Sequence, residues 1–250
     1  MDSTHIRTRT EGAVSVITLA RPEKKNALTI AMYEALTAAL LTADASPAIR
    51  VVMIEGSGGS FTAGNDLMDF MQNPPAGEDS PVFRFLMQLV DQEKPLVIAV
   101  DGPAVGIGTT MLLHADYVVA SREARLSMPF VGLGLCPEGG SSLLLPRLVG
   151  QARATDWLLS GDVIDITEAR QAGLVNAVVA PSELSLFAMT RAKAIADKPP
   201  GSVLLAKRLL REPHRAEIKR VIAHEGHLFV ERLGSAEAAE AFQAFFTRKR

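Results

Sequence analysis

The stretch Leu96-Val-Ile-Ala-Val-Asp-Gly-Pro-Ala-Val-Gly-Ile-Gly108 joins a short apolar run to a glycine-rich turn, and a helical pattern follows from Ile107 to His114. Apolar side chains at consecutive positions are typical of strands that are buried on both faces of a parallel sheet. Three more runs of this kind occupy residues 14–19, 51–54 and 117–120. Because helical patterns such as Thr29–Ala43 alternate with these runs, the sequence predicts an α/β fold with a mainly parallel sheet covered by helices.

The pattern becomes wholly helical after Ser182. Proline lacks the N–H group that a helix interior needs, so an internal proline predicts a break. We therefore divide the chain into an α/β core over residues 1–195 and a C-terminal helical region over residues 196–250. We expect helices at residues 182–196, 201–210, 215–233 and 236–246, separated by Pro199-Pro200, Pro213 and Gly234-Ser235.

Composition is that of an ordinary globular protein. Of the 250 residues, 48% are apolar and 22% are charged, which excludes general disorder. The N-terminus is polar, and no apolar stretch approaches the ~18 residues of a membrane helix, so we expect a soluble, cytoplasmic protein without membrane contacts. The single cysteine, Cys136, excludes a disulfide within the chain and a multi-cysteine metal cluster.

Charge is nearly balanced over the whole chain but not within one segment. The net charge of −2 argues against a nucleic-acid partner. Residues 191–220, however, hold nine basic and three acidic side chains. This local excess of positive charge favours a ligand that carries phosphate groups.

Several common catalytic motifs are excluded because residues that they require are missing from the sequence. The dinucleotide fingerprint would need a third glycine where Met111 stands, and the Gly-Lys pair of a phosphate-binding loop occurs nowhere. The Gly-x-Ser-x-Gly motif of nucleophile-elbow hydrolases is also absent. His224 and His227 are three residues apart rather than four, which favours a solvated helix face over a zinc site. Cys136 has no basic neighbour, so we interpret it as a packed thiol.

Two glycine-containing turns remain, at Phe61-Thr-Ala-Gly-Asn-Asp66 and Gly102-Pro-Ala-Val-Gly-Ile-Gly108. Each lies between a predicted strand and a predicted helix, where backbone N–H groups are unpaired and the helix dipole favours negative charge. Taken alone, either is well explained as a tight turn, with Asp66 as the N-cap of its helix. Taken together, they can direct two N–H donors at one point, which is what an oxyanion hole requires.

The order of the motifs carries more information than any one of them. The relevant segments are Arg21–Leu28, Phe61–Leu67, Val100–Gly108, Leu133–Gly140, Ala169–Val175 and an aromatic, basic C-terminus. In this order they resemble the crotonase superfamily, also called the enoyl-CoA hydratase/isomerase superfamily, over essentially the whole chain. The resemblance implies a spiral of ββα units, a C-terminal helical region that forms homotrimers or dimers of trimers, and chemistry on acyl-CoA thioesters.

The resemblance also implies roles for particular residues. The backbone N–H groups of Asn65 and Ile107 match the two donors of the family's oxyanion hole. Lys24, Lys25 and Lys249 are candidate contacts of CoA phosphates, although each is equally well explained as a solvated lysine. No metal and no cofactor is implied besides the CoA of the substrate. The other candidate substrate or CoA contacts are Ala27, Ala63, Gly64, Asp66, Leu67 and Phe130.

Two departures from the family pattern narrow the predicted activity. Family hydratases carry glutamates where this chain has Thr110 and Phe130, and hydration needs both a base and an acid. Glu138 remains, in Pro137-Glu-Gly-Gly140, where peroxisomal-type Δ3,Δ2-enoyl-CoA isomerases hold their catalytic glutamate. The alternative interpretation of Glu138 is a glutamate in the first turn of a helix, stabilised by the helix dipole.

We therefore predict a Δ3,Δ2-enoyl-CoA isomerase in which Glu138 carries a proton from C2 to C4 of an enolate held by the oxyanion hole. An enoyl-CoA hydratase, a lyase that would use an unidentified second group, is one alternative. A catalytically silent acyl-CoA-binding module is another. A different enolate reaction in the same site, such as decarboxylation, also stays open.

Overall fold

The computed structural model describes residues 5–75, 77 and 79–248. Its strands are β1 (Ile6–Glu11), β2 (Val14–Leu19), β3 (Val51–Gly56), β4 (Leu96–Val100), β5 (Pro103–Val105), β6 (Tyr117–Ser121), β7 (Arg125–Ser127) and β8 (Ala177–Val179). Its α-helices are α1 (Ile30–Ala45), α2 (Leu67–Gln72), α3 (Pro81–Asp91), α4 (Ile107–Thr110), α5 (Ser141–Val149), α6 (Gln151–Ser160), α7 (Ile166–Gln171), α8 (Leu184–Ala196), α9 (Pro200–Leu233) and α10 (Ala236–Arg248). Short 3-10 helices are η1 (Pro22–Lys24), η2 (Met111–His114), η3 (Val131–Leu133) and η4 (Pro181–Glu183).

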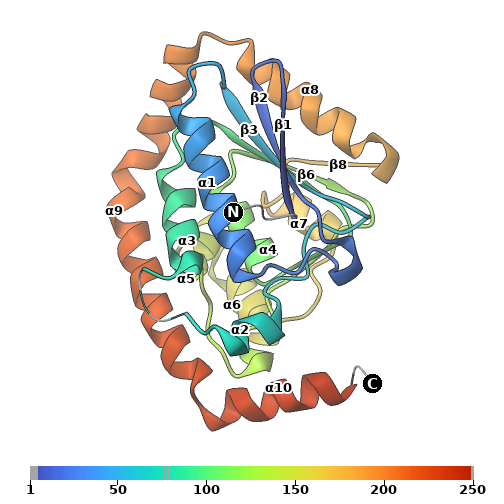
Figure 1. Ribbon diagram of the computed structural model, residues 1–250, viewed down its shortest axis with the longest axis vertical. Coiled ribbons are helices and arrows are strands. Elements are labelled where there is room, and N and C mark those ends of the chain that lie inside the picture. Colours follow the sequence, from blue (N-terminus) through green and yellow to red (C-terminus); the bar gives the residue numbers. More distant parts are fainter. Residues whose placement is uncertain (1–4, 76, 78, 249–250) are drawn as a thin grey trace.

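Within the described residues, a six-stranded sheet has the order β1-β2-β3-β4-β6-β8 (Figure 1). β1 and β2 are antiparallel, and every other neighbouring pair in this sheet is parallel. A second sheet consists of β5 and β7, which are also parallel. The predicted α/β class and the predicted strands of the large sheet are confirmed.

Helices cover both faces of the large sheet. Ala188 and Met189 of α8 pack in one buried cluster with Val14, Val16 and Met53 of the strands. The alternate strand residues face the larger cluster, which includes side chains of α1, α3 and α4. The alternation explains why the strands are apolar at consecutive positions, since both of their faces are buried.

The C-terminal region differs from the prediction at Pro213. α9 is one helix of 34 residues that continues through this proline. Leu209, whose carbonyl loses its helical partner, is 67% exposed, so water can satisfy that carbonyl. Ion pairs on both sides of the proline, Lys207 with Asp116 and Lys219 with Asp91, attach the helix to the core and oppose a break.

The predicted helix from Ile107 to His114 is also different in detail. It begins as α4 and then tightens into the 3-10 helix η2. The imidazole Nε2 of His114, at the end of η2, lies 2.7 Å from the Gly139 carbonyl oxygen, and this contact accompanies the tighter winding. The change brings the end of this segment against the turn that contains Glu138.

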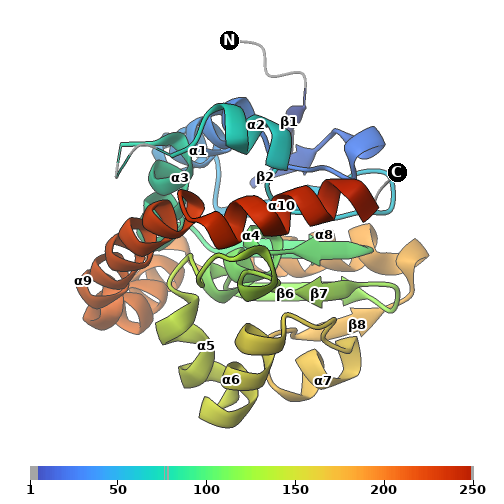
Figure 2. The same cartoon turned by 90° about the horizontal axis from the view of Figure 1, so that it is seen from below.

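The last helix lies across the molecule rather than continuing α9. Figure 2 shows α10 crossing between α2 on one side and α5 and α6 on the other. Gly134, just after η3, marks the contact, because a Cβ at that position would lie 2.8 Å from the Ala238 Cα of α10. In the part of the chain that the structure describes, no helix has the length and apolarity needed to cross a membrane.

Candidate active site

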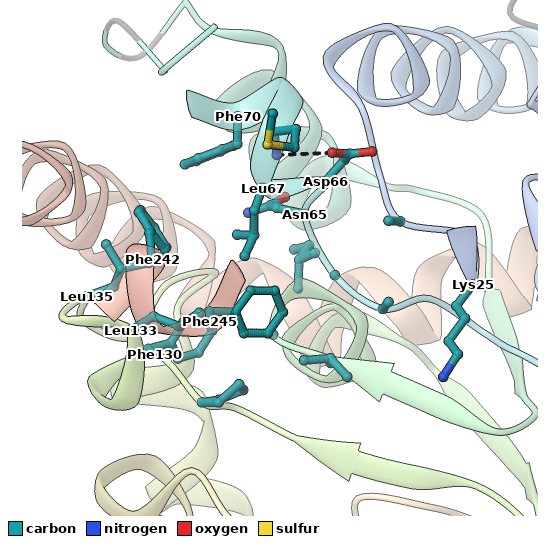
Figure 3. A pocket seen from close by; sticks show the side chains of 18 of the residues that line it. Lys25, Asn65, Asp66, Leu67, Phe70, Phe130, Leu133, Leu135, Phe242 and Phe245 are labelled. Carbon is teal, nitrogen blue, oxygen red and sulfur yellow. Dashed lines mark hydrogen bonds between the residues drawn. The ribbon is translucent and has the colours of Figure 1, made fainter. Parts of the chain in front are cut away.

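A cavity of about 640 Å³ lies between the two glycine-containing turns, α2, η3 and α10. Figure 3 shows Lys25 at one end and apolar side chains such as Phe242 and Leu135 at the other. Glu138 does not line the cavity, and Lys249 lies outside the described residues. The structure brings the remaining predicted site residues together on the cavity wall: Lys24, Lys25, Ala27, Ala63, Gly64, Asn65, Asp66, Leu67, Ile107 and Phe130.

Backbone hydrogen bonds join the two glycine-containing turns. The Thr62 N–H donates to the Pro103 carbonyl at 3.0 Å, and the Val105 N–H donates to the Thr62 carbonyl at 3.0 Å. Gly64 permits the close approach, since a Cβ there would lie 2.7 Å from the Val105 carbonyl oxygen. Its φ of +84° also disfavours any other residue. The glycine is therefore required by backbone packing between the turns.

The Asn65 and Ile107 N–H groups donate to no acceptor among the described residues. Ile107 is the first residue of α4, where a helix leaves its N–H groups free. Asn65 lies on the neighbouring turn, and its side-chain oxygen accepts a hydrogen bond from the Tyr33 hydroxyl of α1. Both residues line the cavity. The arrangement can stabilise a negative oxygen placed between the turns.

The turn after β2 is shaped by Asn26. Lys25 and Asn26 both have positive φ, a conformation that asparagine tolerates better than most residues. The Asn26 side chain is fully buried and donates to the carbonyls of Ser57 and Ser60 at 2.9 and 2.6 Å. These bonds fix the direction in which Lys24 and Lys25 leave the turn, toward one end of the cavity.

Asp66 begins α2 as its N-cap, as predicted. Its side chain accepts hydrogen bonds from the Met68 and Asp69 N–H groups, and the Arg21 guanidinium donates to it at 2.6 Å. Burial opposes the charged form, but the Arg21 hydrogen bond and the backbone N–H groups outweigh burial and lower the pKa of Asp66. Asp66 is therefore an ionised carboxylate with a structural role. Its bond to Arg21 links residues 21–28 to residues 61–67, the two segments that contain most of the predicted CoA contacts.

Glu138 lies in the turn before α5, not in the first turn of that helix. Its side chain accepts a hydrogen bond of 2.5 Å from the Thr110 hydroxyl, and the residue is 7% exposed. Burial raises the pKa of Glu138 to about 8, the Thr110 hydrogen bond opposes this, and the charge of Glu225 adds to it. The Gly140 and Ser142 N–H groups at the start of α5 bind the Glu225 carboxylate rather than that of Glu138, so burial dominates over the helix dipole at Glu138.

Of the apolar end of the cavity, the sequence predicted Phe130 as a substrate contact but not the other phenylalanines. Phe70 of α2 and Phe130 each pack edge-on against Phe229 of α9, with ring centroids 6.1 and 6.5 Å apart. α10 contributes Phe242, Phe245 and Phe246 to the same wall. The spacing of the α10 phenylalanines, which places them on neighbouring helix positions, was the available signal.

The basic excess at residues 191–220 lies elsewhere. None of its side chains lines the cavity. Lys207 and Arg211 pair with Asp116 at 2.7 and 3.2 Å, and Lys219 pairs with Asp91 at 2.6 Å. The segment therefore supplies no side chain to the cavity, and core carboxylates pair with these three cations.

No group of three or more histidine, cysteine, aspartate or glutamate side chains in the described ranges has the arrangement of a metal site. The thiol of Cys136 is half-buried, and burial together with the charge of Glu225 raises its pKa to about 11. A thiol with this pKa is protonated at neutral pH and is a poor nucleophile.

Comparison with known proteins identifies the family. The model of the family described as enoyl-CoA hydratase/isomerase matches residues 9–250. The chain belongs to this family. The solved structure of OdaA from Pseudomonas aeruginosa superposes on this family member with a TM-score of 0.94 at 47% identity, covering 97% of this chain and 99% of that one.

Curated relatives in this family carry more than one activity in their names. Enoyl-CoA delta isomerase 2 of Rattus norvegicus is 35% identical over 99% of this chain, which spans 65% of the rat protein. A probable enoyl-CoA hydratase of Rhizobium meliloti is 32% identical over 96% of this chain and 94% of its own length. The chain shares its family with both kinds of protein, and it shares its crotonase-type α/β fold with the solved structure of OdaA.

Proposed function

We propose that the protein is a Δ3,Δ2-enoyl-CoA isomerase that uses the single carboxylate of Glu138. The observation that supports this most is the environment of Glu138. It is a buried carboxyl with a pKa raised to about 8, bonded to Thr110 one helical turn beyond the free N–H of Ile107. Thr110 and Phe130 occupy the positions where family hydratases hold acids, which leaves one proton-transfer group rather than two.

The reaction needs only groups that this chain supplies. The thioester oxygen accepts hydrogen bonds from the Asn65 and Ile107 N–H groups, which stabilise the enolate. Ionised Glu138 takes a proton from C2, and the electron pair spreads over the dienolate. The same proton is returned to C4, so the double bond moves from C3–C4 to C2–C3. No redox or metal step is part of the proposal.

Glu138 must turn from Thr110 into the cavity for this to occur. Leu135, in the same loop, lines the cavity, as does Ile107 of α4. Both segments that hold Glu138, its own loop and the segment of Thr110, therefore reach the cavity wall. Binding of an acyl chain that displaces Leu135 would open the path, and ionisation of Glu138 would then supply the base.

Among the described residues, two carboxylates do line the cavity, and neither suits the role. Asp66 is held by Arg21 and by two backbone N–H groups, and its lowered pKa makes it a weak base. The Glu23 side chain is 61% exposed at the lysine end of the cavity. The phenylalanines of the apolar end exclude water from the acyl chain, which disfavours hydration.

A panel of 3-enoyl-CoA and 2-enoyl-CoA thioesters tests the proposal. We expect conversion of 3-enoyl-CoA to 2-enoyl-CoA and no 3-hydroxyacyl-CoA. A substrate deuterated at C2 and turned over in ordinary water should retain part of its deuterium at C4, because one carboxylate carries it across. Formation of 3-hydroxyacyl-CoA as the main product would identify a hydratase, and binding without turnover would identify an acyl-CoA-binding module.

We further propose that Lys24 and Lys25 bind the phosphates of CoA and that the helical region around α9 and α10 forms a homotrimer or a dimer of trimers. Both lysines line the cavity, and Figure 3 shows Lys25 at the end away from Phe242, where the CoA part of a thioester would lie. Calorimetry with acetyl-CoA should show binding that weakens with salt. Light scattering should give the mass of three or six chains.

A further inference from the structure

A second buried carboxylate, Glu225 of α9, binds the turn that carries Glu138. Its oxygens accept hydrogen bonds from the Gly140 N–H at 2.6 Å, the Ser142 N–H at 2.9 Å and the Ser142 hydroxyl at 2.5 Å. Glu225 is 5% exposed. Burial raises its pKa, and these donors oppose that change. Two backbone N–H groups and a hydroxyl around one carboxylate favour its charged form, as does the start of α5.

We propose that Glu225 is a positioning residue for Glu138: it holds the turn at residues 138–142 and places a fixed negative charge behind the Glu138 carboxyl. The inference rests on the proposed function, since it assigns Glu225 an effect on the proposed base. Glu225 does not line the cavity and makes no contact with the substrate space.

The turn needs an external support. Gly139 and Gly140 have consecutive positive φ values of 68° and 76°, a conformation that glycine adopts easily but does not enforce. A Cβ on Gly139 would lie 3.1 Å from the Thr110 hydroxyl, so the turn rests against the group that holds Glu138. By binding Gly140 and Ser142, Glu225 fixes the part of the turn that follows Gly139.

Close packing of α9 against α3 fixes the position of Glu225. The next residue, Gly226, is so close to α3 that a Cβ there would lie 2.0 Å from the Phe83 ring. Phe229, one turn further along α9, lines the apolar end of the cavity. One segment of α9 therefore supports both the turn of the proposed base and the wall against which an acyl chain would pack.

The other titratable groups around Glu138 are uncharged at neutral pH. Burial raises the pKa of Tyr33 on α1 well above its usual value. Burial lowers the pKa of His114 on η2 to about 4 and raises that of Cys136, in the same loop, to about 11. Among the described groups that act on Glu138, Glu225 is thus the one whose hydrogen-bond donors favour a charged form.

Cations near this cluster are already paired. Arg211, which acts on His114, binds Asp116 at 3.2 Å, and Arg232, which acts on Cys136, pairs with Glu237. His224 adjoins Glu225 and favours its charged form. The negative charge of Glu225 therefore acts on Glu138 directly and makes it a stronger base.

The test is the pH profile of kcat/KM in Glu225→Gln. Loss of the charge should move the acid limb to lower pH by about 1 unit, because a like charge no longer opposes ionisation of Glu138. We also expect kcat on the plateau to fall about tenfold, since the amide NH₂ cannot accept hydrogen bonds from the turn, with KM unchanged. An acid limb that stays at the wild-type pH in a folded variant overturns the proposal.

Glu217→Gln is the matched control. Glu217 lies on the same helix, but its side chain is 38% exposed and pairs with Arg147 at 2.9 Å. Its replacement removes one charge from α9 without touching the turn, so the acid limb and kcat should stay at wild-type values. An equal shift in both variants would mean that the effect is general to the charge of α9, and the specific assignment of Glu225 would be wrong.

A measurement without turnover separates this inference from the proposed function. Carboxyl ¹³C resonances of the glutamates, assigned with Glu138→Gln, should show Glu225 titrating at lower pH than Glu138 in the wild-type protein. The reverse order would overturn the proposal, even if Glu225→Gln does not fold. If wild type acts on no enoyl-CoA, the proposed function fails, yet a downward shift of the Glu138 titration in Glu225→Gln still supports the role of Glu225.

Discussion

The turns at Asp66 and Glu138 both precede a helix near the cavity, yet they treat their carboxylates in opposite ways. Asp66 is paired with Arg21 and caps α2, and its pKa is lowered. Glu138 has no cation partner among the described residues and bonds to the neutral Thr110 hydroxyl, and its pKa is raised to about 8.

The difference shows how the surroundings of two carboxylates give them different roles. A carboxylate surrounded by donors stays ionised and holds structure, whereas one surrounded by apolar groups exchanges its proton near neutral pH. Pairs of titratable groups whose pKa values are displaced in opposite directions are typical of sites that transfer protons. Asp66 should therefore matter mainly for stability and Glu138 mainly for turnover.

The largest expected effect is that of Glu138→Gln. The substitution keeps the shape of the side chain and removes the base, so turnover of 3-enoyl-CoA should fall by about 10²–10⁴-fold, the usual contribution of a positioned general base. Affinity for CoA thioesters should stay near the wild-type value. Steady-state kinetics and calorimetry measure the two quantities. Isomerisation at the wild-type rate would mean that Glu138 is not the base.

The same variant should reveal the pH dependence of folding. The pKa of Glu138 rises from an ordinary value of 4.5 to about 8, so the folded protein binds this proton more tightly than the unfolded chain. The resulting stabilisation is complete below about pH 4.5 and is lost as the pH rises through 8. In urea titrations, the free energy of unfolding should fall less between pH 5 and 8 for Glu138→Gln than for wild type. Parallel curves would contradict the raised pKa.

Asp66→Asn should lower the stability of the protein more than its turnover. Asparagine can still cap α2, but Arg21 loses its closer anionic partner and keeps only the longer contact of 3.9 Å with Glu23. We expect the free energy of unfolding to fall by about 1–3 kcal/mol, as for other hydrogen bonds between charged groups. Turnover under folding conditions should fall less than tenfold. A loss of turnover as large as that of Glu138→Gln, with stability unchanged, would reverse the assignment of the two carboxylates.

Thr110→Ala should have the smallest effect. The Thr110 hydroxyl favours the charged form of Glu138, so its removal should raise the pKa of Glu138 and move the acid limb of kcat/KM to higher pH. At neutral pH the rate should fall by less than about tenfold. A limb that moves to lower pH would show that Thr110 favours the protonated form instead.

Local sequence patterns were enough for features that depend on neighbouring residues. They predicted the buried strands of the large sheet, the N-cap role of Asp66, and the two turns that carry Asn65 and Ile107. The spacing of the glycines shows where backbone can approach closely, as Gly64 confirms at Val105.

Features that depend on contacts between distant segments were missed. Glu225 is 87 residues from Glu138 in sequence, and nothing in its local pattern shows that it binds the Gly140 turn. α9 continues through Pro213, and ion pairs with the core hold it in place. Lys207 of the basic segment pairs with Asp116 and does not line the cavity. The motif of Glu138 likewise does not show that its side chain is absent from the cavity lining.

The pH dependence of kcat/KM for a 3-enoyl-CoA tests the central claim most directly, since this quantity reports the ionisation of groups in the free enzyme. If Glu138 is the base, kcat/KM should rise about tenfold per pH unit up to about pH 8 and then level off, and the residual activity of Glu138→Gln should lack this limb. A profile that is flat between pH 6 and 9, or a limb near pH 8 that persists in Glu138→Gln, would contradict the account.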